Sequence, residues 1–183
     1  MKAAQALLLL LCTFVGSSAQ FPPAGSPFAA AVDSLRASML KLHSSHKLTA
    51  ADGKVFDYNL SILDVTSDAA TCTLTWKDKA DLTVSSQIHT RSVVLDDILS
   101  VNSVSSANSK MVVDPYIQIV QIHMKPDKSA IDVTENFKPD GSPIGTPTTK
   151  RAPVVVIFTS SEPEATTIIR ELTALMSRCS VQK

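Results

Sequence analysis

The middle of this 183-residue chain carries side chains that alternate between apolar and polar. Every second residue is apolar across residues 56–62, and the same alternation returns across residues 72–76. Successive side chains of a β-strand point to opposite faces of a sheet, so the pattern predicts strands with one buried face. Residues 66–68, with the sequence Thr-Ser-Asp, favour a turn between the two runs and therefore a β-hairpin.

Other segments of the middle region share this strand character. They are residues 81–88, 91–95 continuing toward 101, 116–124 and 152–159. Several short strands separated by turn-forming residues favour antiparallel pairing. We therefore expect the middle of the chain to form mostly antiparallel β-sheet.

Helical patterns flank the strand-rich region on both sides. Apolar side chains recur at steps of four and three from residue 28 to residue 42, and Ser26 followed by Pro27 gives a typical helix start, which predicts an amphipathic helix over residues 28–46. This N-terminal helix is expected to dock on its own domain, with pairing to a partner helix as the alternative. A C-terminal amphipathic helix is predicted after Ser161, because Glu164 follows at the spacing of a capping box.

Residues 125–153 interrupt the strand pattern. This segment holds five of the ten prolines of the chain, together with Gly141 and Gly145. We expect a long insertion between two strands, because proline and glycine punctuate loops and turns. Such an insertion is either functional or a tolerated surface loop.

The first nineteen residues have the composition of a secretory signal peptide. Lys2 precedes an apolar run that includes five consecutive leucines, and small residues follow at 16–19. The run is about half of the ~20 residues that a membrane-spanning helix needs. We therefore expect cleavage after Ala19, a linker over residues 20–27, secretion, and no transmembrane segment after cleavage. The alternatives are a retained signal anchor and a buried N-terminal helix.

Two features fit an oxidising compartment. Cys12 would leave with the signal peptide, so Cys72 and Cys179 would remain and are predicted to form a disulfide. Closing a loop of about 100 residues stabilises by roughly 4 to 5 kcal/mol in the chain-entropy description. Two buried free thiols are the alternative. Asn59 begins the triplet Asn-Leu-Ser and is a candidate glycosylation site if it faces solvent.

Several strings of the chain resemble a known architecture. Residues 74–76 on an early strand, residues 91–101, and residues 155–159 leading into 165–175 look like the N-terminal region of sphingosine-kinase and ceramide-kinase type lipid kinases. The order of strands and final helix resembles a pleckstrin-homology-like domain. The resemblance implies a bent antiparallel sheet or partly open barrel over residues 54–180, plugged by the C-terminal helix. With the N-terminal helix added, the expected class is α+β.

The chain also departs from these kinases. They continue into a catalytic domain with a glycine-rich nucleotide loop, whereas this chain has no Gly-Gly pair. Their phosphoinositide-binding relatives carry several basic residues after an early strand. Here Lys77, Lys79 and Arg91 are the candidates for contact with a lipid headgroup, with a solvated loop as the alternative.

The sequence offers little for catalysis or for metal binding. His43 and His46 are three residues apart, but no nearby cysteine or carboxylate completes a metal site. Asp96 and Asp97 are adjacent, so in a strand they would point to opposite faces. No nucleophile elbow or phosphate-binding loop is present in the sequence. We therefore assign no catalytic residue, cofactor or metal, and expect a protein that is not an enzyme.

The net charge of the chain limits the classes of partner that it favours. Without Lys2 the 17 basic residues become one fewer than the 17 acidic residues, so neither nucleic acid nor an anionic membrane is favoured. The leading expectation is a secreted, non-catalytic interaction module that presents a sheet edge, a groove or the long insertion to a protein or peptide partner. The alternatives are a carrier of a lipid or small hydrophobic ligand, and a truncated lipid-kinase-like product.

Overall fold

A computed structural model describes residues 26–49, 53, 55–105 and 118–180. The predicted signal peptide, and the linker as far as residue 25, lie outside the described residues. Helices and strands follow in the order α1 (Pro27–Met39), β1 (His43–Thr49), β2 (Val55–Asp68), β3 (Thr73–Leu82), β4 (Ser85–Val94), the 3-10 helix η1 (Leu95–Asp97), β5 (Ile98–Ser105), β6 (Gln118–Met124), β7 (Ala130–Phe137), β8 (Thr148–Ala152), β9 (Val154–Thr159) and α2 (Glu162–Ser180). Neither helix of this described part is long and apolar enough to span a membrane.

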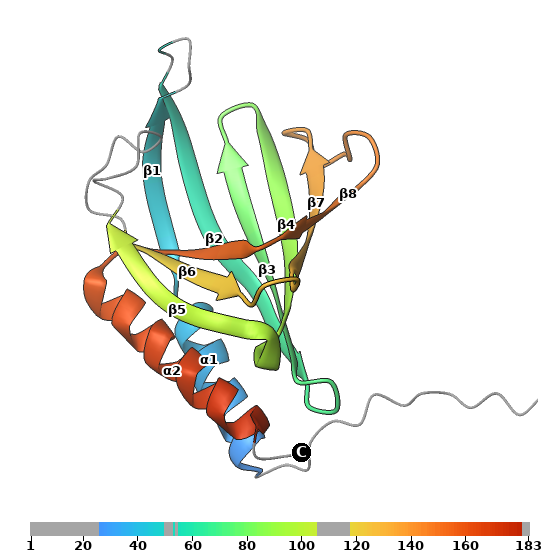
Figure 1. Cartoon of the computed structure of the whole chain (residues 1–183). Helices are drawn as coiled ribbons and strands as arrows, with labels where there is room; N and C mark the ends of the chain where they lie inside the picture. The colour runs from blue at the N-terminus through green and yellow to red at the C-terminus, as the bar shows by residue number, and fades with distance from the viewer. Residues whose placement is uncertain (1–25, 50–52, 54, 106–117, 181–183) are drawn as a thin grey trace, which may run out of the picture.

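The strands form two antiparallel sheets that do not close into a barrel. One sheet has six strands in the order β1-β2-β3-β4-β7-β8, and the other has three in the order β5-β6-β9. Figure 1 shows the six-stranded sheet curving around the smaller one, with β9 crossing its concave side and both helices at one end. The predicted α+β class with a bent antiparallel sheet is confirmed.

The chain leaves the first sheet at η1. Leu95 is buried there, and its backbone N–H donates to the carbonyl of Cys72 at 2.8 Å. This turn directs β5 into the second sheet. The predicted strand running from residue 91 toward 101 is therefore two strands in different sheets.

One strand prediction and one turn prediction are changed by the structure. The predicted strand over residues 81–88 contains the β3–β4 hairpin, in which Leu82 pairs with Ser85. The alternation of side chains continues through this two-residue turn, which hides it from a pattern search. The predicted turn at 66–68 lies inside β2, and the chain turns after Asp68, whose carboxylate accepts from Ala70 N and Thr71 Oγ1 at 2.9 Å.

The N-terminal helix is shorter than predicted. The Ser26 hydroxyl caps α1 by accepting from Ala29 N at 3.0 Å, as expected, but the helix ends at Met39 and not at residue 46. Residues 43–49 form β1, which pairs along β2. Serine and histidine favour helices only weakly, so pairing with β2 determines the conformation of this segment. The sheet consequently begins before residue 54, the predicted start of the domain.

The predicted insertion is partly sheet. Within residues 125–153, β7 pairs with β4 and β8 pairs with β7, so this segment supplies two strands of the larger sheet. All five prolines of the segment lie outside β7 and β8. Proline breaks strands, which made the whole segment resemble a loop. The prediction of one uninterrupted insertion is wrong for these two strands.

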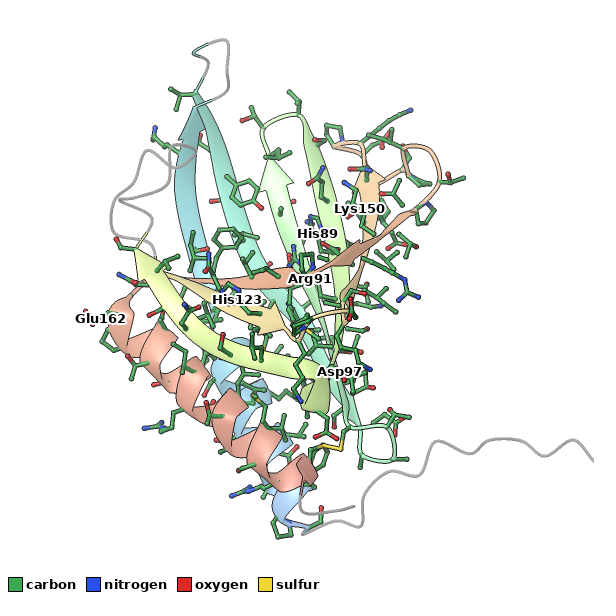
Figure 2. The ribbon with its side chains drawn as sticks, in the orientation of Figure 1. His89, Arg91, Asp97, His123, Lys150 and Glu162 are labelled. Atoms are coloured by element: carbon green, nitrogen blue, oxygen red, sulfur yellow. A yellow bond between two sulfur atoms is a disulfide. The ribbon has the colours of Figure 1, made fainter. Side chains whose placement is uncertain are left out.

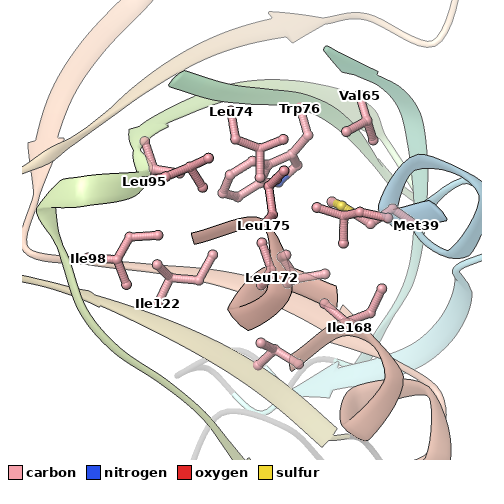
Figure 3. Close-up of a cluster of buried hydrophobic side chains, with 14 of the residues drawn as sticks. Met39, Val65, Leu74, Trp76, Leu95, Ile98, Ile122, Ile168, Leu172 and Leu175 are labelled. Carbon is pink, nitrogen blue, oxygen red and sulfur yellow. The ribbon is translucent and has the colours of Figure 1, made fainter. Parts of the chain in front are cut away.

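One apolar core joins the sheets and helices. Figure 3 shows Leu74 and Trp76 of β3 facing Ile122 of β6, Leu172 of α2 and Met39 of α1. The capping box predicted for α2 is formed in part. The Ser161 hydroxyl accepts from Glu164 N at 3.4 Å as predicted, whereas the Glu164 carboxylate accepts from Ser160 N at 2.8 Å and not from Ser161 N. The core lies at the end of the molecule that the helices cover. The part of the large sheet farther from the helices is not filled by this core.

Candidate functional site

The concave face of the large sheet changes from apolar to charged along each of its central strands. On β3 the inward side chains are Leu74 and Trp76, and then Asp78. The register places Trp76 opposite Arg91 and Asp78 opposite His89 on β4. Because directly paired residues share a face, the charged groups of neighbouring strands meet at one level of the sheet.

Strands β7 and β8 extend this charged level. Asp132 is paired with Arg91 and with Lys150, and Thr134 is paired with His89. Figure 2 shows His89, Arg91 and Lys150 on the side of the sheet that β9 crosses. We call this surface the polar concave face, formed by Tyr58, Asp78, Gln87, His89, Arg91, Asp132, Thr134, Asn136 and Lys150.

Arg91 is the centre of this face. Its Nη1 donates to Asp78 Oδ2, and its Nε donates to Asp132 Oδ2 at 3.4 Å. The side chains of Arg91, Asp78 and Asp132 are 10%, 5% and 21% exposed. A charge removed from water needs a partner, and the one guanidinium is shared by two carboxylates.

Burial alters the titration of two groups beside Arg91. Loss of solvent raises the pKa of Asp78 above its ordinary value, and the charges of Arg91 and His89 reduce that rise without cancelling it. Burial also raises the pKa of Tyr58, with a smaller contribution from the negative charge of Asp78. The Tyr58 phenol is therefore held in its protonated form.

His89 is oriented by its neighbours on β7. Its Nδ1 lies 3.2 Å from Asp132 Oδ1 and 3.1 Å from Thr134 Oγ1. Gln87 Nε2 donates to Asn136 Oδ1 at 3.0 Å one register step further along. The result is a row of fixed donors and acceptors on two adjacent strands, which suits recognition of a polar ligand.

The predicted headgroup residues do not form one site. Arg91 is on the concave face, whereas Lys77 and Lys79 lie on the opposite, convex face because they alternate with Asp78. Lys79 Nζ pairs with Asp81 Oδ1 at 2.9 Å, and Lys77 is exposed. The thickness of the sheet separates Arg91 from the two lysines, so the structure does not bring the three cations together on one surface.

The two cysteines are bonded. Cys72, in the turn between β2 and β3, forms a disulfide with Cys179 near the end of α2, with a Cα–Cα distance of 5.9 Å. This confirms the predicted pair and excludes two free thiols. The bond fastens the C-terminal helix to the large sheet across a sequence separation of 107.

Asn59 has the exposure that glycosylation requires. Its side chain is exposed on β2, where the residue pairs with Ser45 of β1 and Asp81 of β3. It lies on the convex face, on the other side of the sheet from Arg91. A glycan at Asn59 stays a prediction, and it would leave the polar concave face uncovered.

The other residues considered from the sequence are dispersed. His43 and His46 both belong to β1, and the side chain of His46 lies outside the described part of the chain. Asp97 pairs with Lys128 at 3.4 Å, and His123 Nε2 lies 3.2 Å from Gln121 Oε1. The described residues contain no group of three or more potential metal ligands.

Sequence reasoning missed most of the polar concave face. Asp78 did carry a signal, because it continues the inward phase of Leu74 and Trp76 with a charged residue. Asp132 and Thr134 carried none, since they fall in a segment that resembled a loop. Only the sheet register brings them beside Arg91.

No protein-family model, curated protein or solved structure matches this chain. The resemblance to pleckstrin-homology-like domains and to lipid kinases therefore stays a prediction. The polar concave face is the site from which function is argued.

Proposed function

We propose that this protein is a secreted, non-catalytic binding module that recognises an extended, polar segment of a protein partner through its polar concave face. Secretion is supported by the predicted signal peptide and by the Cys72–Cys179 disulfide, since such bonds persist in oxidising compartments. Recognition is supported by the charged network on β3, β4 and β7.

The buried ion network carries this proposal. A buried ion pair is often no more stabilising than well-packed apolar residues, because both charges lose water. One register step below Asp78 and His89, Trp76 sits in the apolar core, so the same strands can accommodate apolar side chains. Charged groups with shifted pKa values gather preferentially at functional sites. The network therefore favours recognition over a purely structural role.

The shape of the face fits an extended segment. Gln87 and His89 on β4, Asn136 on β7 and Lys150 on β8 come from three adjacent strands, and none of them is fully buried. Their donors and acceptors are spaced by the strand register, which matches the regular spacing of amides in an extended peptide. Lys150 adds an exposed cation at the rim.

The interior supports partner binding over ligand carriage. Carriers enclose drug-sized or larger ligands in cavities of roughly 300–1,000 Å³. Here Trp76, Ile122 and Leu172 fill the space between the sheets, and the space that remains beside Trp76 measures about 10 Å³. The depression between the end of α1 and the start of α2, of about 300 Å³, is open and partly polar.

A matched pair of charge reversals tests the proposal. The full chain is expressed in a secreting cell line, purified from the medium and immobilised, and proteins retained from extracellular fluid are identified by mass spectrometry. Lys150→Glu changes the concave face, and Lys77→Glu makes the same change on the convex face. We expect Lys150→Glu to lose a partner that both the parent protein and Lys77→Glu retain.

Two outcomes would contradict the proposal. In the first, both variants retain the same proteins as the parent. In the second, native mass spectrometry of the secreted protein shows a co-purifying lipid-sized mass, which would favour the carrier alternative.

A further inference from the structure

A small space, partly open to the surface, lies where β9 crosses the large sheet. Its walls include Ser44 of β1, Trp76 and Asp78 of β3, and Val156 of β9. Its volume is about 10 Å³. A single water molecule needs about that much room, and no organic ligand fits in it.

Two of the residues that line this space each carry a buried polar atom with no hydrogen-bond partner in the described part of the chain. These atoms are Trp76 Nε1 and Ser44 Oγ, on residues that are 1% and 7% exposed. The indole N–H can only donate, so it requires an acceptor. A buried donor without a partner costs about 1–3 kcal/mol, which is a substantial fraction of the stability of a domain.

The polarity of the walls determines what the space holds. Internal cavities lined only by apolar groups stay dry, whereas polar ones hold water that makes two to four hydrogen bonds. Asp78 and Arg91 also line the space, and Asp78 Oδ2 accepts from Arg91 Nη1. Of these groups, the indole N–H is a donor, the Asp78 carboxylate is an acceptor, and the Ser44 hydroxyl can act as either.

We propose that this space is a binding site for one ordered water molecule, which accepts the Trp76 indole N–H and donates to the polar side chains on the wall. The water links the apolar core at Trp76 to the charged level at Asp78. It is a fixed component of the fold and does not depend on the partner proposed above.

The chain offers an unambiguous probe, because it contains a single tryptophan. In ¹⁵N-labelled secreted protein the indole N–H of Trp76 gives one resonance, and its cross-peaks to water are measured in NOE and ROE experiments. We expect cross-peaks of opposite sign in the two experiments, which mark a long-lived bound water. Absence of any water cross-peak at this proton would overturn the proposal.

Variants at Ser44 distinguish a bound water from the hydroxyl proton of Ser44 as the source of the cross-peak. A hydroxyl proton of Ser44 that exchanges with solvent would also give a cross-peak at the water frequency. Ser44→Ala removes this hydroxyl, so a bound water predicts that the cross-peak remains. Loss of the peak in Ser44→Ala would assign it to the hydroxyl and overturn the proposal.

Filling the space provides the complementary test. Ser44→Val adds methyl groups to the wall, so we expect the cross-peak to disappear, while Ser45→Val on the exposed face of the same strand retains it. Retention in Ser44→Val would place the water elsewhere and contradict the site. If that variant fails to fold, a high-resolution crystal structure of the parent protein decides the question. We expect a density peak about 3 Å from Trp76 Nε1, and its absence there would overturn the proposal.

Discussion

The two halves of the concave face are made by the same strands but have opposite chemistry. Near the helices, β3 and β4 contribute Leu74, Trp76 and Val93, which are nearly inaccessible to solvent. One step further along, the same strands contribute Asp78, His89 and Arg91. The geometry of a sheet does not require the side chains to change from apolar to charged along a strand. We therefore assign the apolar half to stability and the charged half to recognition.

The largest loss of stability is expected from removing the Cys72–Cys179 disulfide, which links α2 to the apolar half of the large sheet. In the double variant Cys72→Ala/Cys179→Ala, the free energy of unfolding should fall by about 4–5 kcal/mol, because the unfolded chain regains the freedom of a loop of about 100 residues. Chemical denaturation measures this change. A loss below about 1 kcal/mol would show that packing alone holds α2 to the sheet.

Truncating the apolar half ranks next. Leu74→Ala should lower the free energy of unfolding by about 2–5 kcal/mol, because Leu74 is inaccessible to solvent and its removal leaves a cavity. Leu99→Ala on β5 is the control, since Leu99 is 61% exposed. Equal effects in urea denaturation would contradict the assignment of the core to this half.

The polar half should respond differently to single and paired changes. Asp78→Leu leaves Arg91 with one carboxylate, and should cost about 1–3 kcal/mol. The paired variant Asp78→Leu/Arg91→Met removes both charges, and should be within about 1 kcal/mol of the parent or more stable. If the paired variant is less stable than the single one, the network has a structural role and the argument for recognition weakens.

The pH dependence of stability sharpens the same contrast. Because burial raises the pKa of Asp78 in the folded protein, the folded state binds this proton more tightly than the unfolded state. The contribution of Asp78 to stability therefore declines as the pH rises from below its ordinary pKa through its folded pKa. The difference in unfolding free energy between the parent protein and Asp78→Asn should thus favour the parent more at acidic pH than at neutral pH. A difference that moves the other way would contradict the raised pKa.

The smallest effect on stability is expected at the rim. Lys150→Glu and Lys77→Glu are both at exposed positions, and each should change the free energy of unfolding by no more than about 0.5 kcal/mol. Thermal denaturation checks this. A large loss in Lys150→Glu alone would mean that β8 is held by its charge, and its binding result would need a milder variant such as Lys150→Gln.

The amino-acid sequence determined the parts of this protein that depend on local pattern. Alternation at residues 56–62 and 72–76 predicted strands, the serine before Pro27 marked the start of a helix, and two cysteines predicted the disulfide that is observed. Each of these signals depends on residues close in sequence, or on a residue type with few roles, so each could be interpreted without the fold.

Tertiary structure alone decided the rest. Residues 43–49 form a strand because they pair with β2. In the proline-rich segment, β7 forms because it pairs with β4, and β8 then pairs with β7. Arg91 meets Asp132 across 41 positions of sequence, and only the register of paired strands brings them together. Hydrogen bonding between strands that are distant in sequence leaves no periodic pattern in residues 125–153. The residues of the polar concave face could therefore not be predicted from the sequence alone.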